Sequence, residues 1–147
     1  MKTRLGKKQK GAAAIEFALV FVIFFAVLYG VVSYSLPLLL VQSFNNATAE
    51  AVRRSMAVDP TAANYGGLVE TLAKNVLNEK LSWVPTAVMG SLVPAATYNA
   101  TTKVLTASVT LPATALTSIM PVLKLGIITV PNLPTSLKAE SSAQLVP

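Results

Sequence analysis

The residue types in this sequence leave little room for covalent chemistry. The 147 residues include neither cysteine nor histidine, so thiolate nucleophiles, histidine-based triads and the usual zinc sites are excluded. Serine and lysine lie two residues apart at Ser82 and Lys80, and again at Ser136 and Lys138. Such neighbours form no activated nucleophile without a groove and an oxyanion site. With no glycine-rich phosphate loop or metal-ligand cluster in the sequence, we expect a protein that binds other molecules, with no catalytic residue, cofactor or metal.

One carboxylate, Glu16, lies where an ionised group is costly. It is the only charge in an apolar run that follows Gly11 and extends to Val32. An ionised side chain in a membrane segment costs from about 2.5 kcal/mol upward, so its presence indicates a function with a partner. The alternative is that Glu16 lies in the first turn of a helix, where the N-terminal amides favour a carboxylate.

A basic leader and a long apolar helix position this carboxylate. Five of the twelve basic residues precede Gly11 and no acidic residue does, which favours a cytoplasmic N-terminus. A helix over residues 13–36 is about 36 Å long at roughly 1.5 Å per residue, enough to cross a hydrocarbon core of about 30 Å. Tyr29 and Tyr34 are then candidate interfacial anchors. The run is longer than the apolar region of a secretory signal and has no clear small-x-small cleavage site after it, which disfavours a cleaved signal.

The remaining residues carry little net charge. The chain has a net charge of +6, and beyond the leader seven basic residues stand against six acidic ones. The high pI therefore describes the leader, and we expect no nucleic-acid partner.

One stripe of the apolar helix consists of small residues at a spacing of four. It contains Ala14, Ala18, Val22, Ala26 and Gly30. Small residues at this spacing allow close helix approach in lipid, where association relies on packing. The alternative is that alanine is simply common in membrane helices.

The start of the helix resembles the type IV pilin processing signal in its Flp, or tight-adherence, form. Gly11 is followed by four residues and then by Glu16 and Phe17. The resemblance implies that a prepilin peptidase cuts on the cytoplasmic side between Gly11 and Ala12, which removes residues 1–11. It also implies that Glu16 meets the new α-amino group of a neighbouring subunit. That amine has a pKa near 8 in model peptides and is largely protonated at pH 7, so a shared pair lowers the cost of both charges.

A longer segment, from residue 11 to about 60, resembles the TadE-like family of tight-adherence minor pilins. The pattern Gly-Ala-Ala-Ala-x-Glu-Phe-Ala-Leu-Val is present, and residues 44–60 are similar to the family's Asn-Ala-Ala-Arg-Glu-like helix and Ala-Val-Asp-Pro-like turn. Thr48-Ala49-Glu50 departs from that pattern, so no role is carried over to an arginine there. We expect Arg53 and Arg54 to form a solvated face or an intersubunit contact.

Past residue 36 the first helix is predicted to leave the membrane and continue to about Val58. Apolar residues recur over residues 41–56 at spacings of three and four, opposite a polar side. Asp59-Pro60 ends the pattern, because helix is disfavoured before proline. A second amphipathic helix is predicted over residues 68–81, with Glu70 and Lys74 paired at i, i+4.

The rest of the chain favours short strands, which gives an α+β head with an antiparallel sheet of three or four strands. Residues 104–111 and 137–145 alternate apolar with polar side chains, as half-buried strands do. The other expected elements are a loop up to residue 94, a strand at 96–98 joined to 104–111 as a hairpin, a short helix or turn at 113–120, and a strand at 127–130.

These features predict a TadE-like minor pilin or pseudopilin of the bacterial inner membrane. Residues 1–11 form the leader, 12–36 the membrane and assembly helix, and 37–147 a periplasmic or pilus-tip head. The resemblance implies as partners a prepilin peptidase, other pilins, the pilus assembly platform and the inner membrane, and a role in adhesion and biofilm. Two alternatives remain open: a type II secretion pseudopilin, and an unprocessed membrane-anchored periplasmic interaction protein.

Overall fold

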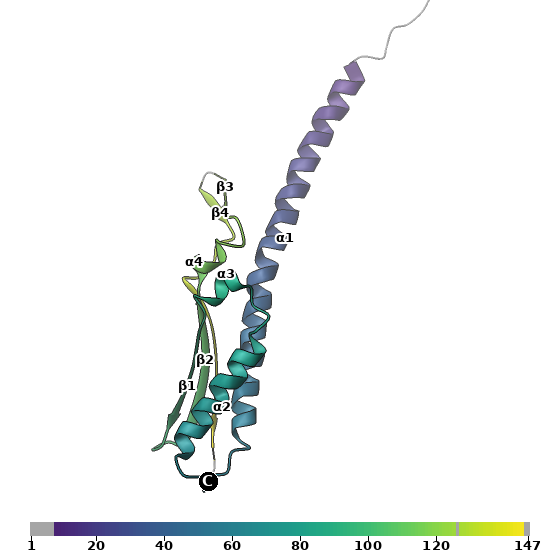
Figure 1. The fold of residues 1–147 in the computed structure, drawn as a ribbon. Helices are drawn as coiled ribbons and strands as arrows, with labels where there is room; N and C mark the ends of the chain where they lie inside the picture. The colour runs from purple at the N-terminus through teal and green to yellow at the C-terminus, as the bar shows by residue number, and fades with distance from the viewer. Residues whose placement is uncertain (1–7, 126, 146–147) are drawn as a thin grey trace, which may run out of the picture.

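The computed structural model describes residues 8–125 and 127–145, so most of the expected leader, residues 1–7, lies outside the described residues. A long N-terminal helix rises from a small head of helices and strands (Figure 1). This arrangement confirms the predicted α+β class. The elements are α1 (Lys8–Ser55), α2 (Tyr65–Lys80), α3 (Thr86–Met89), β1 (Val93–Asn99), β2 (Val104–Pro112), α4 (Ala113–Leu116), β3 (Leu123–Leu125), β4 (Ile128–Val130) and β5 (Ser136–Gln144).

Helix α1 is one continuous element with two different environments. It contains 48 residues and passes through Pro37, so at roughly 1.5 Å per residue it is about 72 Å long. Side chains from residue 11 to residue 28 are exposed, and the part from Leu40 onward packs into the head. The helix ends at Ser55, three residues before the predicted Val58. Turn hydrogen bonds from Met56 to Arg53 and from Val58 to Ser55 follow it.

The head is a layer of two helices on one face of a three-stranded antiparallel sheet. The strand order is β1-β2-β5, with β2 in the middle. Helix α1 lies mainly against β5, and α2 packs against both α1 and β1. The predicted alternation in β2 is confirmed, because Leu105, Ala107, Val109 and Leu111 are fully buried between sheet and helices.

Helix α2 confirms the second amphipathic helix and corrects one predicted ion pair. It buries Val69, Ala73, Val76 and Leu77. Glu70, expected to pair with Lys74, instead accepts a hydrogen bond from the backbone N–H of Tyr98 in β1 at 2.8 Å. A carboxylate that satisfies a backbone donor of the neighbouring strand replaces an exposed i, i+4 pair, which is worth only a few tenths of a kcal/mol.

Two further segments differ from the predictions. The expected loop before residue 94 contains the short helix α3, whose Val88 is fully buried. At the end of α1, Met56 is exposed and Ser55 is buried in its place. Ser55 can be buried because its single hydroxyl hydrogen has two acceptors within reach, the Ala51 carbonyl at 2.8 Å and the Val69 carbonyl at 3.3 Å.

The five strands that the structure describes form two separate sheets. The three-stranded sheet matches the predicted size, and β3 pairs with β4 as a separate two-stranded antiparallel sheet. A partly buried hydroxyl pair joins α1 to the main sheet, because the Thr48 Oγ1 lies 2.9 Å from the Ser141 Oγ of β5. The head is thus tied to the C-terminal half of α1, which leaves the N-terminal half uncovered.

Candidate assembly surface

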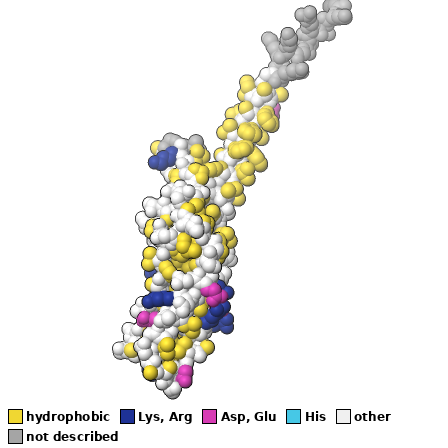
Figure 2. Space-filling model, in the orientation of Figure 1, with side chains coloured by type: hydrophobic (Ala, Val, Ile, Leu, Met, Phe, Trp, Pro, Cys, Tyr) yellow, Lys and Arg dark blue, Asp and Glu magenta, His cyan; other side chains and the backbone are white. Residues whose placement is uncertain are grey.

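The N-terminal half of α1 carries the largest exposed apolar surface that the structure describes. Within its 18-residue window of highest hydropathy the mean hydropathy is 2.6 and none of the residues is buried. Phe17, Phe21 and Phe25 form a ladder along one side, with ring centroids 5.9 and 4.8 Å apart. Helix α1 is therefore long enough and apolar enough to cross a membrane, which supports membrane anchoring of the chain. Figure 2 shows the concentration of hydrophobic side chains along the helix.

Glu16 lies on this exposed surface together with Phe17, which is 69% exposed. Among the side chains that the structure describes, which begin at Gly11, no basic group forms an ion pair with the Glu16 carboxylate. Glu16 is nine residues into a helix that begins at Lys8, so it is not in the first turn of α1 in the uncut chain. Favourable interaction with the N-terminal amides extends over about one turn only, and in this chain it does not account for the carboxylate.

The predicted stripe of small residues lies on the uncovered part of α1. Ala14, Ala18 and Ala26 are exposed, and Gly30 is half-buried where the head begins. A Cβ placed on Gly11 or on Gly30 meets nothing within 4 Å. Packing inside this chain therefore requires neither glycine.

The junction between Gly11 and Ala12 lies inside helix α1, which begins five residues before the predicted start at residue 13. Glycine in a helix interior is about 1 kcal/mol less favourable than alanine. Gly11 is consequently a weak point near the helix N-terminus, with open space around it.

A charged cluster at the other end of α1 lies on the solvated side of the head. The Glu50 carboxylate accepts hydrogen bonds from Arg53 at 2.7 and 2.8 Å and from Arg54 at 2.8 Å. These hydrogen bonds, from Arg53 first and Arg54 second, lower the pKa of Glu50 to about 2. Arg54 also contacts Glu79 of α2 at 3.1 Å, whereas Arg53 is 71% exposed. The predicted solvated face is confirmed for Arg53, whereas Arg54 is half-buried between Glu50 and Glu79; an intersubunit contact stays a prediction.

Neither serine-lysine pair noted in the sequence forms a hydrogen-bonded dyad. The Ser82 hydroxyl donates to the backbone carbonyl of Glu79 at 2.8 Å, and the Lys138 ammonium pairs with Glu140 at 2.8 Å. A catalytic role for either serine would require a base within reach of the hydroxyl.

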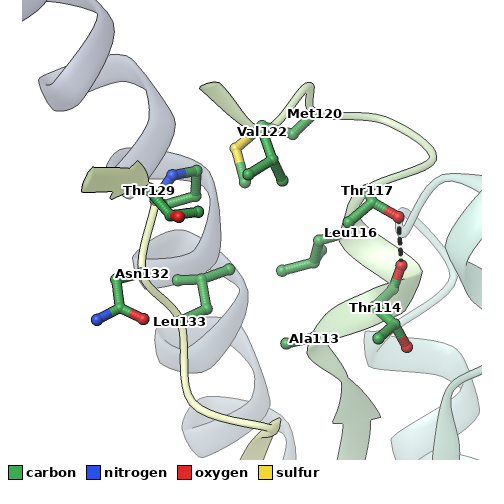
Figure 3. A pocket seen from close by; sticks show the side chains of 10 residues that line it. Ala113, Thr114, Leu116, Thr117, Met120, Val122, Thr129, Asn132 and Leu133 are labelled. Atoms are coloured by element: carbon green, nitrogen blue, oxygen red, sulfur yellow. Dashed lines mark hydrogen bonds between the residues drawn. The ribbon is translucent and has the colours of Figure 1, made fainter. Parts of the chain in front are cut away.

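A cleft of about 260 Å³ lies between α4 and the segment that follows β4 (Figure 3). The Thr117 hydroxyl in its wall is engaged with the backbone carbonyl of Thr114 at 2.7 Å. None of the lining side chains is ionisable, so the cleft offers a binding surface without a general acid or base. The lining residues are Ala113, Thr114, Leu116, Thr117, Met120, Val122, Thr129, Pro131, Asn132 and Leu133.

Two contacts between α1 and the head have no signal in the sequence pattern. The Tyr29 hydroxyl donates to the Pro121 carbonyl, and the Tyr34 hydroxyl accepts from the backbone N–H of Asn132 at 2.9 Å. The partners are 92 and 98 residues apart in the chain. The sequence predicts both tyrosines as membrane-interface anchors, which stays a prediction, and gives no sign that they hold the head to α1.

Comparison with known proteins agrees with the residues that carry the resemblance. The family model described as TadE-like protein matches residues 11–53. The match includes Gly11, Glu16 and the part of α1 that enters the head, and leaves the sheet outside it. The comparisons with curated proteins and with solved structures find no match.

Proposed function

We propose, from the match of residues 11–53 to the TadE-like family model, that the chain is a minor pilin or pseudopilin of the tight-adherence system. Its task is the assembly, priming or capping of the tight-adherence pilus. It works by binding other subunits, without catalysis or cofactor, and contributes in this way to surface adhesion and biofilm.

The observation that carries the proposal is the uncovered N-terminal half of α1. A head that contacts α1 only from Tyr29 onward leaves from Gly11 to Leu28 an apolar rod with one carboxylate, Glu16. Lipid solvates the apolar side chains of such a rod favourably, but it offers no partner to the ionised carboxylate. A bundle of like helices satisfies both, since small residues let helices approach and a cation on a neighbour pairs with Glu16.

Proteolytic removal of the leader supplies the cation that pairs with Glu16. A prepilin peptidase at the cytoplasmic face cuts after Gly11, and the first turn of α1 unwinds there to give the protease access to the peptide bond. Removal of residues 1–11 takes away five basic residues, which otherwise hold the N-terminus in the cytoplasm. The freed α-amino group of Ala12 is largely protonated at pH 7 and meets Glu16 of an adjacent subunit.

The topology follows from the same asymmetry of charge. The leader lies in the cytoplasm, residues 12–36 span the inner membrane, and the head lies in the periplasm and later in the pilus. The partners are the prepilin peptidase, other pilins and the assembly platform.

Variants of Glu16 distinguish cleavage of the leader from incorporation of the subunit into the pilus. In cells with the cognate peptidase and pilus machinery, Glu16→Ala and Glu16→Gln should be cut normally, as measured by mass spectrometry of the membrane fraction. Their amount in sheared pili should fall about tenfold or more, because an unpaired ammonium is then left in an apolar bundle. Glu140→Ala is the matched control, since Glu140 is an exposed glutamate of the head, and it should be incorporated like the wild type. Normal incorporation of both Glu16 variants would disprove the assembly role of the carboxylate.

A further inference from the structure

The β3–β4 hairpin lies at the end of the head that faces along α1 toward the N-terminus (Figure 1). Two hydrogen bonds fix its height on the helix. Pro121, just before the hairpin, accepts from the Tyr29 hydroxyl, and Asn132, just after it, donates to the Tyr34 hydroxyl. Both ends of the hairpin are therefore held at the level of residues 29–34 of α1.

This level coincides with the outer boundary of the hydrocarbon. A core of about 30 Å is crossed by about 20 helical residues, and the apolar run begins at Ala12. Within the proposed membrane helix, residues 12–36, the hydrocarbon therefore ends close to Val31, and the following residues lie at the headgroups. The hairpin extends from this height toward the N-terminal half of α1 (Figure 1), that is, toward the membrane and not away from it.

The described side chains of the hairpin and its approach suit a lipid surface. Ile127 is fully exposed, and Val122 and Leu123 are more than a third exposed. Lys124 is exposed beside them, and Figure 2 shows a basic group among hydrophobic side chains at this end of the head. Apolar side chains flanked by lysine bind at the boundary of acyl chains and headgroups, with the ammonium extended to the phosphates.

We infer that Ile127 of the β3–β4 hairpin, together with Val122 and Leu123 at its approach, inserts into the outer leaflet of the inner membrane beside α1, with Lys124 at the phospholipid headgroups. The inference rests on α1 spanning the membrane, as in the proposed function. The head then has two membrane contacts, one deep and one shallow, which fix its tilt against the bilayer. A subunit that leaves the membrane for the pilus has to withdraw both.

Site-directed spin labelling of the full chain tests the insertion, and the absence of cysteine makes single-cysteine variants direct. Nitroxide-labelled Ile127→Cys, Phe24→Cys and Thr101→Cys are placed in nanodiscs of phosphatidylethanolamine and phosphatidylglycerol that hold one copy each. Phe24 lies in the expected span, and Thr101 is exposed in the turn between β1 and β2. The measured quantity is accessibility to oxygen relative to a water-soluble nickel chelate.

The ratio at residue 127 should be about tenfold higher than at residue 101 and lower than at residue 24. Lys124→Gln, or exchange of phosphatidylglycerol for phosphatidylcholine, should reduce the ratio at residue 127 and leave the ratio at residue 24 unchanged. A ratio at residue 127 equal to that at residue 101, with residue 24 still in lipid, overturns the hairpin contact alone. Water access at residue 24 overturns the span and the hairpin contact together. Protection of residue 127 that needs two copies in a disc assigns the hairpin to a subunit interface and also overturns the lipid contact.

Discussion

Replacing Phe44 by alanine should loosen the head from α1 while leaving the membrane helix intact. Phe44 is fully buried where α1 enters the head, and Phe24, in the same helix, is 59% exposed. Truncating a buried phenylalanine to alanine costs about 3–5 kcal/mol, a large part of a typical stability of about 5–15 kcal/mol. Truncating Phe24, which packs edge-on against Phe25 of the same helix and lies outside the head, should change the stability of the head by less than about 0.5 kcal/mol.

Urea denaturation of the full chain in detergent micelles, followed by tryptophan fluorescence, measures the difference. Trp83 is the single tryptophan, and its indole N–H donates to the Ser43 hydroxyl of α1 at 3.2 Å. Its emission therefore reports on the contact between α1 and the head. With a slope of about 1–3 kcal/mol per M of urea, Phe44→Ala should lower the midpoint by at least about 1 M.

Both variants replace a phenylalanine of α1 by alanine, so a difference between their midpoints reports on burial in the head and not on the type of substitution. If neither Phe44→Ala nor Phe24→Ala lowers the midpoint, the head does not pack on the C-terminal half of α1. If both lower it by a similar amount, the part of α1 before Tyr29 also carries head contacts.

Two other changes test the head itself by the same urea titration. Because Arg53 and Arg54 lower the pKa of Glu50 from 4.5 to about 2, its contribution to stability is complete above pH 4.5 and is lost as the pH falls toward 2. Glu50→Gln should flatten this acid loss, leaving the smaller slope from Asp59, whose pKa is lowered by hydrogen bonds from Thr61; an unchanged slope would contradict the assignment. Gly66→Ala places a Cβ 3.0 Å from the Tyr98 ring and should cost about 1 kcal/mol net, since overpacking exceeds the gain in helix propensity. Gly90→Ala, with nothing within 4 Å, is the control, and equal effects of the two would refute the contact.

Local pattern in the sequence was enough to predict most of the fold. The 3.6-residue period gave α2, and strict alternation gave the buried side of β2, because both patterns report which side of an element faces the core. Glu16 and the apolar run could be recognised for a similar reason, since a single charge within an apolar run is evident from the local sequence alone. The match to the TadE-like family model over residues 11–53 confirms the resemblance. The cut after Gly11 and the role of Glu16 stay predictions.

The remaining features depend on contacts between distant parts of the chain. Glu70 bonds to a strand 28 residues away and Tyr34 to a backbone N–H 98 residues away. No local spacing encodes such pairs, because they arise when the elements pack. The short helix α3 was missed for the same reason, as its one buried side chain, Val88, gives no periodic signal.

The mass of the wild-type subunit in sheared pili tests the central claim most directly. The account predicts a protein that lacks residues 1–11 and begins at Ala12, present together with the other pilins. Recovery of the protein only in the membrane fraction, with Met1 to Gly11 intact in the presence of an active prepilin peptidase, would contradict it and favour a permanently anchored protein.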